Sequence, residues 1–174
     1  PATDLVVHPR LLKIEPGERA SLRVGFLDAP PAVERAYRIQ ISQLPDPDGA
    51  PDGAVHMLTR VSLPVFVQAS SGQPLLGLDS AQWVGDRLHL RLHNTGNRHQ
   101  PPTPGVLRVL DAGGDEVARV EHTLGYVLAG AALVIEQDGL GSACRVGVAA
   151  EFVSEELDAP LRIDMTSAPR ACAD

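Results

Sequence analysis

Apolar and polar residues alternate along several short stretches of this chain, and each such stretch predicts a β-strand with one buried face. In residues 20–26, Leu22, Val24 and Phe26 share a face, and in residues 87–94 leucines alternate with polar side chains. Further strands are predicted at residues 37–42, 106–110, 115–120, 126–135, 146–152 and 161–165, while residues 5–7 form only a short apolar run. Strands spaced about ten residues apart are typical of a β-sandwich, and no helical pattern with caps stands out. We therefore predict an all-β fold.

The longest alternating stretch covers residues 55–65. One face carries Val55, Met57, Thr59, Val61, Leu63 and Val65, and the other carries His56, Leu58, Arg60 and Ser62. Pro64 cannot donate a hydrogen bond, so its N–H side is predicted to lie at a sheet edge or at a bulge. Such an edge strand can offer its backbone to another chain, although the same pattern also fits an ordinary edge strand of a sandwich.

Turn-forming residues divide the chain into two parts. Pro16-Gly17 predicts a type II turn, because glycine accepts a positive φ without steric cost. Small and polar residues from Ala69 to Pro74 predict a linker between two domains. We predict a first domain at residues 1–68, a linker at 69–78 and a second domain at 79–174.

The composition narrows the range of functions. The chain has 15 Lys and Arg against 22 Asp and Glu, a net charge of −7, and only 3% aromatic residues. An acidic chain with so few aromatic side chains is a poor binder of nucleic acid. No apolar run reaches the roughly 20 residues that span a bilayer, so no membrane insertion is expected. The chain starts at Pro1 without a signal segment, which predicts a mature or trimmed form.

The two cysteines, Cys144 and Cys172, are predicted to form one disulfide in an oxidising compartment. Such a bond would stabilise the fold by roughly 3–4 kcal/mol by restricting the unfolded chain. The alternative is a pair of unrelated thiols, one of them on a frayed tail. Their separation excludes a CxxC redox motif, and no spacing of cysteines and histidines resembles a zinc site.

No group of residues predicts catalysis or metal binding. His89 and His93 lie about 13 Å apart along one strand face, too far to share a metal ion, so a solvated polar face is the better interpretation. Acidic residues also alternate in one loop and could bind calcium, but the spacing is not that of an EF-hand and the loop prolines favour a solvated connection; these are Asp46, Asp48 and Asp52. We expect no enzyme activity, no metal ion and no cofactor.

Several segments, in order along nearly the whole chain, carry a resemblance to a known family. They are the Pro16-Gly17 turn with the strand after it, Tyr37–Ile41 running into Gln43-Leu44-Pro45, Arg60–Val67, Asn94–His99 and Gly125–Leu128. Together they resemble the periplasmic pilus-assembly chaperones of the chaperone–usher pathway, the PapD-like family. The segment Arg60–Val67 most resembles the version found in the archaic, spore-coat-U-type branch.

The resemblance implies two immunoglobulin-like β-sandwich domains and a periplasmic protein that is not an enzyme. Members of the family lend the last strand of the first domain to a pilin subunit that lacks its own final strand, and deliver the subunit to an outer-membrane usher. In this chain the donor strand would be about residues 54–67. The side chains that fill the subunit would be Val55, Met57, Thr59, Val61 and Leu63, with Thr59 in a shallow or half-wet pocket.

The resemblance also implies features that this chain does not match directly. Basic residues in the family's cleft hold the carboxylate at the end of the subunit, one on the first strand of the first domain and one on its last strand. Ser62 stands at the second position and Arg60 is expected to point to the other face, so the carboxylate anchor is unassigned. The first strands have no counterpart, which would leave the apolar faces at Leu22 and Ile39 uncovered. The chain is expected to have lost its beginning, to borrow strands from another copy, or to be a degenerate relative.

A second function remains open from the sequence. A secreted structural or adhesive β-sandwich could self-associate through the same edge strand. A carbohydrate-binding sandwich is disfavoured, because Trp83 is the only tryptophan available for a binding face.

Overall fold

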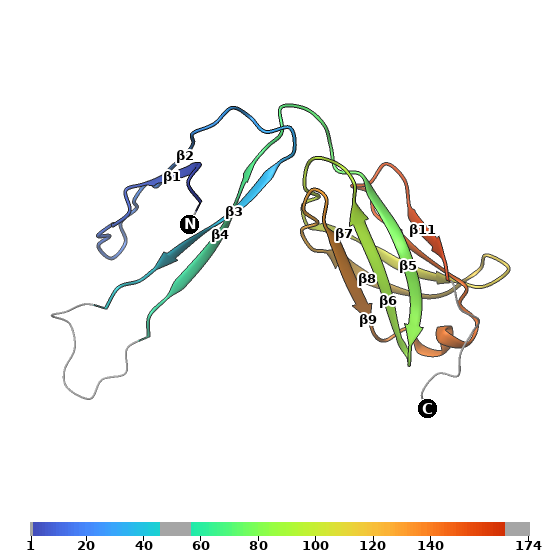
Figure 1. Cartoon of the computed structure of the whole chain (residues 1–174). Coiled ribbons are helices and arrows are strands. Elements are labelled where there is room, and N and C mark those ends of the chain that lie inside the picture. The colour runs from blue at the N-terminus through green and yellow to red at the C-terminus, as the bar shows by residue number, and fades with distance from the viewer. Residues whose placement is uncertain (1, 46–56, 166–174) are drawn as a thin grey trace. The chain divides into compact units, whose positions relative to one another are not determined.

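The computed structural model describes residues 2–45 and 57–165. The chain forms two units, which we call unit 1 (residues 1–70) and unit 2 (residues 71–174). Apart from a 3₁₀ helix at Gly141–Arg145, the regular elements of the described residues are β-strands (Figure 1). The all-β prediction is therefore confirmed. Within the described ranges, no helix is long and apolar enough to cross a membrane.

Unit 2 is an immunoglobulin-like β-sandwich of two antiparallel sheets (Figure 1). One sheet has the order β5-β6-β9 and the other has the order β11-β10-β7-β8. The strands are β5 (Leu76–Val84), β6 (Arg87–Asn94), β7 (Thr103–Leu110), β8 (Glu116–Leu124), β9 (Ala132–Gln137), β10 (Ala149–Val153) and β11 (Leu161–Asp164).

The core of unit 2 lies between these two sheets. The three leucines of β6 are fully buried, as their alternation predicted, and the other sheet contributes buried aliphatic and aromatic side chains. Burial of each such side chain stabilises the fold by about 1.5–3 kcal/mol. The residues are Leu88, Leu90 and Leu92 on β6, Leu107 and Val109 on β7, and Phe152 on β10.

The buried Asn94 at the end of β6 ties three segments of unit 2 together. Its side-chain oxygen accepts hydrogen bonds from the N–H groups of Leu75 (3.0 Å) and Gly96 (2.9 Å). Its side-chain nitrogen donates to the carbonyls of Arg98 (2.7 Å) and Val127 (3.0 Å). Every polar atom of this buried amide is paired, as burial requires.

The predicted strand at 126–135 is wrong in its first part. Val127 makes only an isolated bridge to Gln100, and β9 begins at Ala132. Between them the chain turns at Gly130, which has a φ of +70° and donates its N–H to the carbonyl of Asn94. The turn requires a left-handed residue, and glycine accepts that conformation at no steric cost.

Two further boundaries of unit 2 differ from the sequence prediction. β5 includes the last residues of the predicted linker 69–78, because Leu76 and Leu78 pair with β6. The predicted strand at 146–152 begins only at Ala149, because Gly147 donates its N–H to Ala143 in the 3₁₀ helix at 2.7 Å.

Unit 1 contains two separate antiparallel pairs of strands: β1 (Leu5–His8) with β2 (Arg23–Phe26), and β3 (Arg35–Ser42) with β4 (Arg60–Val67). The Pro16-Gly17 turn forms as predicted, with Gly17 at a φ of +82° and the Glu18 N–H bonded to the carbonyl of Glu15. The strand predicted at 20–26 is shorter and excludes Leu22.

A polar and aromatic cluster joins the two strand pairs of unit 1. The Asp4 carboxylate accepts hydrogen bonds from the Tyr37 hydroxyl (2.6 Å) and the Arg35 guanidinium (2.7 Å). The hydrogen bond from Tyr37 is the main cause that lowers the pKa of Asp4, while desolvation raises the pKa of Tyr37. Phe26 on β2 packs near the Tyr37 ring, with centroids 6.4 Å apart. The cluster fixes β1–β2 against the start of β3.

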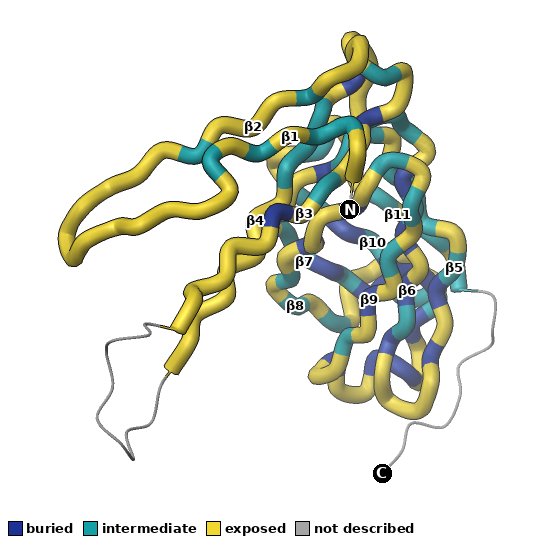
Figure 2. Tube along the Cα trace, turned by 60° about the vertical axis from the view of Figure 1, so that its left-hand side comes forward, coloured by how far each residue is buried: buried dark blue, intermediate teal, exposed yellow. Residues whose placement is uncertain are grey.

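Unit 1 has almost no buried core in the part of it that the structure describes. Only Ile39 and Ala69 are buried apolar residues there, and Figure 2 shows most of β3 and β4 coloured as exposed. The sequence predicted an uncovered apolar face at Leu22 and Ile39. Ile39 is buried instead, and the exposed apolar side chains of the β3–β4 pair are those of Ile41 and its neighbour Val61.

Candidate strand-docking site

The β3–β4 ribbon has one apolar face and one polar face. The register pairs Ile39 with Leu63 and Ile41 with Val61, so these four side chains lie together on one face. Residues of the other parity, including Arg38, Ser62 and Arg60, lie on the opposite face. The ribbon therefore presents an apolar surface and a polar surface within a single pair of strands.

β4 is an edge strand in the described part of unit 1, because its pairing partner there is β3 alone. Pro64 stands opposite Arg38 in this pair. The prediction that the proline lies at a sheet edge is confirmed. The long strand predicted at 54–67 is wrong at its beginning, since residues 57–59 form no strand and β4 starts at Arg60.

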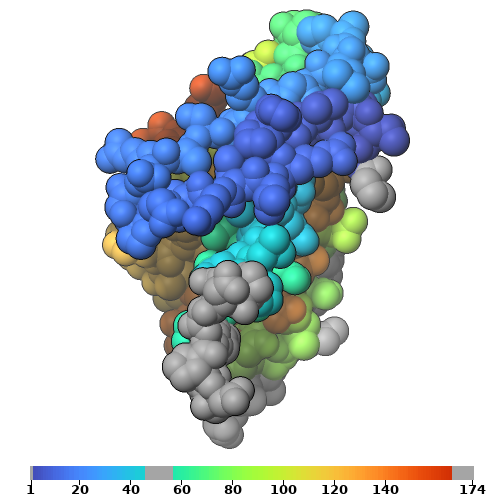
Figure 3. All heavy atoms as spheres, turned by 90° about the vertical axis from the view of Figure 1, so that its left-hand side faces the viewer, coloured from blue at the N-terminus to red at the C-terminus, as the bar shows by residue number. Residues whose placement is uncertain are grey.

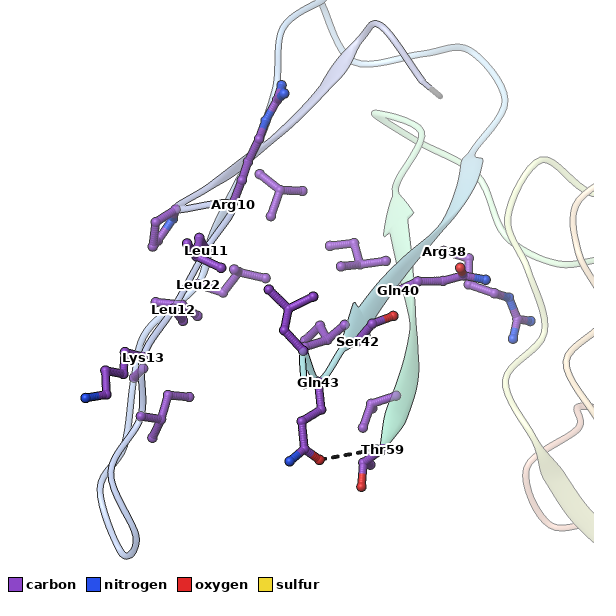
Figure 4. A pocket seen from close by; sticks show the side chains of 18 of the residues that line it. Arg10, Leu11, Leu12, Lys13, Leu22, Arg38, Gln40, Ser42, Gln43 and Thr59 are labelled. Atoms are coloured by element: carbon purple, nitrogen blue, oxygen red, sulfur yellow. Dashed lines mark hydrogen bonds between the residues drawn. The ribbon is translucent and has the colours of Figure 1, made fainter. Parts of the chain in front are cut away.

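The end of β3 explains why the ladder stops at Arg60. Beyond Ser42, the Gln43 N–H still bonds to the carbonyl of Thr59 (2.8 Å), but the Thr59 N–H bonds to the Gln43 side chain instead of its backbone (3.2 Å; Figure 4). Leu44 and Pro45 then continue outside the ladder. Residues 57–59 thus have no neighbouring strand within unit 1 that could keep them in a sheet.

The predicted donor side chains are now placed as follows. Val61 and Leu63 lie on β4 and are each 43% exposed, while Met57 is 89% exposed before the strand. Thr59 is exposed next to Gln43. Val55 lies outside the described residues. The apolar side chains of this segment are therefore available to a partner, increasingly so towards Met57.

A hollow of 1270 Å³ lies between the β3–β4 ribbon and the segment of residues 9–22. Figure 4 shows Leu11, Leu12 and Leu22 on one side of it and the β3–β4 ribbon on the other. Figure 3 shows the N-terminal segment, in blue, directly beside the cyan residues of β3 on one face of the unit. Sequence reasoning missed the contribution of residues 9–14, whose short apolar run gave no periodic signal.

The polar face of the ribbon contains a basic group that sequence reasoning did not assign. The Arg38 guanidinium donates a 3.4 Å hydrogen bond to the Ser62 hydroxyl, and Figure 4 shows this side chain pointing away from residues 9–22. Arg60 is two residues from Ser62 on the same strand, so it shares the face of Ser62, and the expectation that it points elsewhere is wrong. The contact between Arg38 and Ser62 depends on the strand register, which places Arg38 diagonally opposite Ser62 and cannot be read from the sequence.

The remaining candidates lie apart from this site. His89 and His93 lie on the outer face of β6, where His93 Nδ1 is 2.5 Å from the Asp79 carboxylate. No group of three or more metal-ligating side chains occurs within residues 2–45 and 57–165. The loop of Asp46, Asp48 and Asp52 lies outside the described residues. Trp83 is buried in the core of unit 2, 3% exposed.

The disulfide stays a prediction. Cys144 is fully buried in the core of unit 2, and Cys172 lies outside the described residues.

Comparison with known proteins gives a match to a family model in the first unit. The chain matches no curated protein and no solved structure. Residues 1–72 match the family model of the pili and flagellar-assembly chaperones, PapD N-terminal domain. This match covers unit 1 with its open edge strand and supports the chaperone–usher family for that part of the chain.

Proposed function

We propose that this protein is a periplasmic chaperone that binds pilin subunits by lending them the edge of β4. The observation that carries the proposal is the exposed, apolar edge segment Met57–Leu63 within a unit that matches the chaperone family. The branch of the family, the outer-membrane usher that receives the subunit, and the disulfide between Cys144 and Cys172 are further parts of this proposal.

The physics of strand donation fits the exposed segment. A subunit that lacks one strand exposes an apolar groove and unpaired backbone groups, both of which promote aggregation. An extended segment supplies hydrogen bonds through its backbone and apolar contacts through alternate side chains. Met57, Val61 and Leu63 would each contribute about 1.5–3 kcal/mol on full burial. Residues 57–59, which form no strand in the described part of unit 1, would gain backbone partners by pairing with the subunit.

We further propose that Arg38, Ser62 and Arg60 form the missing carboxylate anchor. A guanidinium binds a carboxylate through charge-assisted hydrogen bonds, and a serine hydroxyl beside it adds another donor. Among the described residues, neither Arg38 nor Arg60 forms an ion pair with an acidic side chain. Arg38→Ala is expected to weaken subunit binding by about tenfold, with Arg10→Ala on the segment 9–22 as the matched control.

The decisive experiment is co-expression with candidate pilin subunits in a bacterial periplasm, followed by affinity capture. The wild-type chain is expected to form a stable 1:1 complex, and a Val55→Asp, Met57→Asp double variant is expected to lose it. Leu58→Asp is the control for an acidic substitution at a neighbouring exposed apolar position, since Leu58 is 49% exposed and has the opposite parity in the sequence.

The alternative is a structural protein that self-associates through the same edge. It predicts polymers of the wild-type chain without any pilin, abolished by the same double variant. Polymers combined with a failure to capture any pilin subunit would replace the chaperone proposal with this one. Equal capture by the wild type and the double variant would show that the segment is not the donor.

A further inference from the structure

The backbone of β4 alternates between groups that face β3 and groups that face the open edge. Gln43 and Thr59 stand opposite each other as a pair at a hydrogen-bonding position of the ribbon, because the Gln43 N–H donates to the Thr59 carbonyl. In an antiparallel ladder such pairs recur at every second position, so Ile41 with Val61 and Ile39 with Leu63 are also hydrogen-bonded pairs. The N–H and C=O groups of the residues between them point away from β3.

This alternation places Pro64 on the open edge of β4. Pro64 faces Arg38 at a position where neither residue bonds across the ribbon. The missing N–H therefore costs the β3–β4 ladder nothing, which is why a proline is tolerated in the middle of this strand. The same missing N–H removes one hydrogen-bond donor from the backbone groups of β4 that an incoming strand would meet.

We propose that Pro64 limits the docking edge of β4, so that a subunit strand pairs with the backbone at Arg60 and Ser62 and stops before position 64. The proposal rests on strand donation by β4. A carbonyl of the incoming strand placed opposite Pro64 finds no donor, and the fixed φ and ring of proline disturb the pairing further. Continued pairing would bury an unsatisfied carbonyl, which is unfavourable.

Pro64 divides β4 into a part that is open to a subunit and a part that packs within the chain. Before Pro64, the side chains of β4 are exposed, and after it Val65, Phe66 and Val67 are half-buried in unit 1. Pairing is thus directed to the segment that contains Met57, Thr59 and Val61. The half-buried residues after Pro64 do not pair with the subunit strand.

The test is residue-resolved amide exchange by NMR of the full chain, free and in its 1:1 complex with the pilin subunit captured by co-expression. The proposal predicts slower exchange for the amides of Arg60 and Ser62 and unchanged exchange for that of Phe66. Slower exchange at all three positions would overturn the limit while leaving strand donation intact. Unchanged exchange at Arg60 and Ser62, or no captured subunit, would overturn strand donation and this proposal with it.

Substitutions at the proline give an independent measurement. Pro64→Val and Pro64→Ala both restore an N–H, so each is expected to extend protection to the amide at position 64 and to slow dissociation of the subunit by about fivefold. Pro74→Val is the control for removing a proline elsewhere in the chain and should leave dissociation unchanged. Dissociation of both position-64 variants at the wild-type rate, in chains that retain the wild-type circular dichroism spectrum, would contradict the proposal.

Discussion

Unit 2 buries the leucines of β6 between two sheets, whereas the described part of unit 1 has two separate strand pairs and leaves most of its large apolar side chains exposed. Both units contain strands with the same alternation of apolar and polar residues. The difference is that unit 2 supplies a second sheet to cover the first. Alternation therefore specifies which face of a strand is apolar, while the presence of a covering layer decides whether that face becomes a core or a docking surface.

The largest expected effect comes from emptying the core of unit 2. Phe152→Ala should lower the free energy of unfolding by about 3–5 kcal/mol, because the ring is buried and the backbone of Gly105 packs closely on it. Scanning calorimetry of the full chain would measure this as a shift of the unit 2 transition. Val84→Ala, at an exposed position on β5, should change it by less than about 0.5 kcal/mol. A loss below 1 kcal/mol for Phe152→Ala would contradict a closed core.

Removing the buried amide of Asn94 should have the next largest effect. Asn94→Ala removes the four hydrogen bonds that this buried amide forms with Leu75, Gly96, Arg98 and Val127, and we expect a loss of at least about 2 kcal/mol. Urea denaturation followed by circular dichroism would measure it. The neighbouring Thr95→Ala removes only an exposed hydrogen bond of 3.4 Å and should be nearly neutral. Equal effects of both substitutions would show that Asn94 is not the residue that joins these segments.

An equivalent truncation in unit 1 should be much less damaging. Ile41 is 41% exposed on the face of the hollow, so Ile41→Ala should cost less than about 1 kcal/mol in the free chain. Urea denaturation with circular dichroism is again suitable. A cost comparable to that of Phe152→Ala would mean that unit 1 contains a closed core, and the comparison between the units would fail.

The smallest effect concerns the pH dependence of unit 1. The pKa of Asp4 is lowered, first by the hydrogen bond from Tyr37, so its contribution to stability is lost as the pH falls below roughly 4. The pKa of Tyr37 is raised, first by desolvation, so its contribution is present below roughly pH 10 and lost above it. The contact therefore stabilises unit 1 between these two limits.

Asp4→Asn tests this pH dependence. The difference in unfolding free energy between the wild type and Asp4→Asn should be present at neutral pH and should shrink on acidification. Paired urea titrations at several pH values would measure it. A difference that stays constant from neutral pH to pH 3 would contradict the role of the Asp4 carboxylate.

The sequence predicted most strands where apolar alternation and turn residues agreed. β3, β6 and the β7–β8 hairpin formed as expected, and the leucines of β6 are buried. Two predictions failed where a backbone hydrogen bond at a glycine overrode the local pattern. Gly130 turns the chain by bonding to Asn94, and Gly147 bonds back to Ala143, so both predicted strands begin late.

The candidate site was predicted less completely than the fold. The edge position of Pro64 followed from its missing N–H, which is a property of one residue. The end of β4 at Arg60 depends on where β3 stops, and the Arg38–Ser62 contact depends on the register between two strands. Neither is visible in a single stretch of sequence, because pairing between strands joins residues distant along the chain.

The buried position of Trp83 has a consequence for spectroscopy. It is the only tryptophan of the chain, and it lies in the core of unit 2, whereas Tyr37 lies in unit 1. Tryptophan fluorescence thus reports on the environment of unit 2 alone. An optical assay of subunit binding to β4 therefore needs a label placed in unit 1.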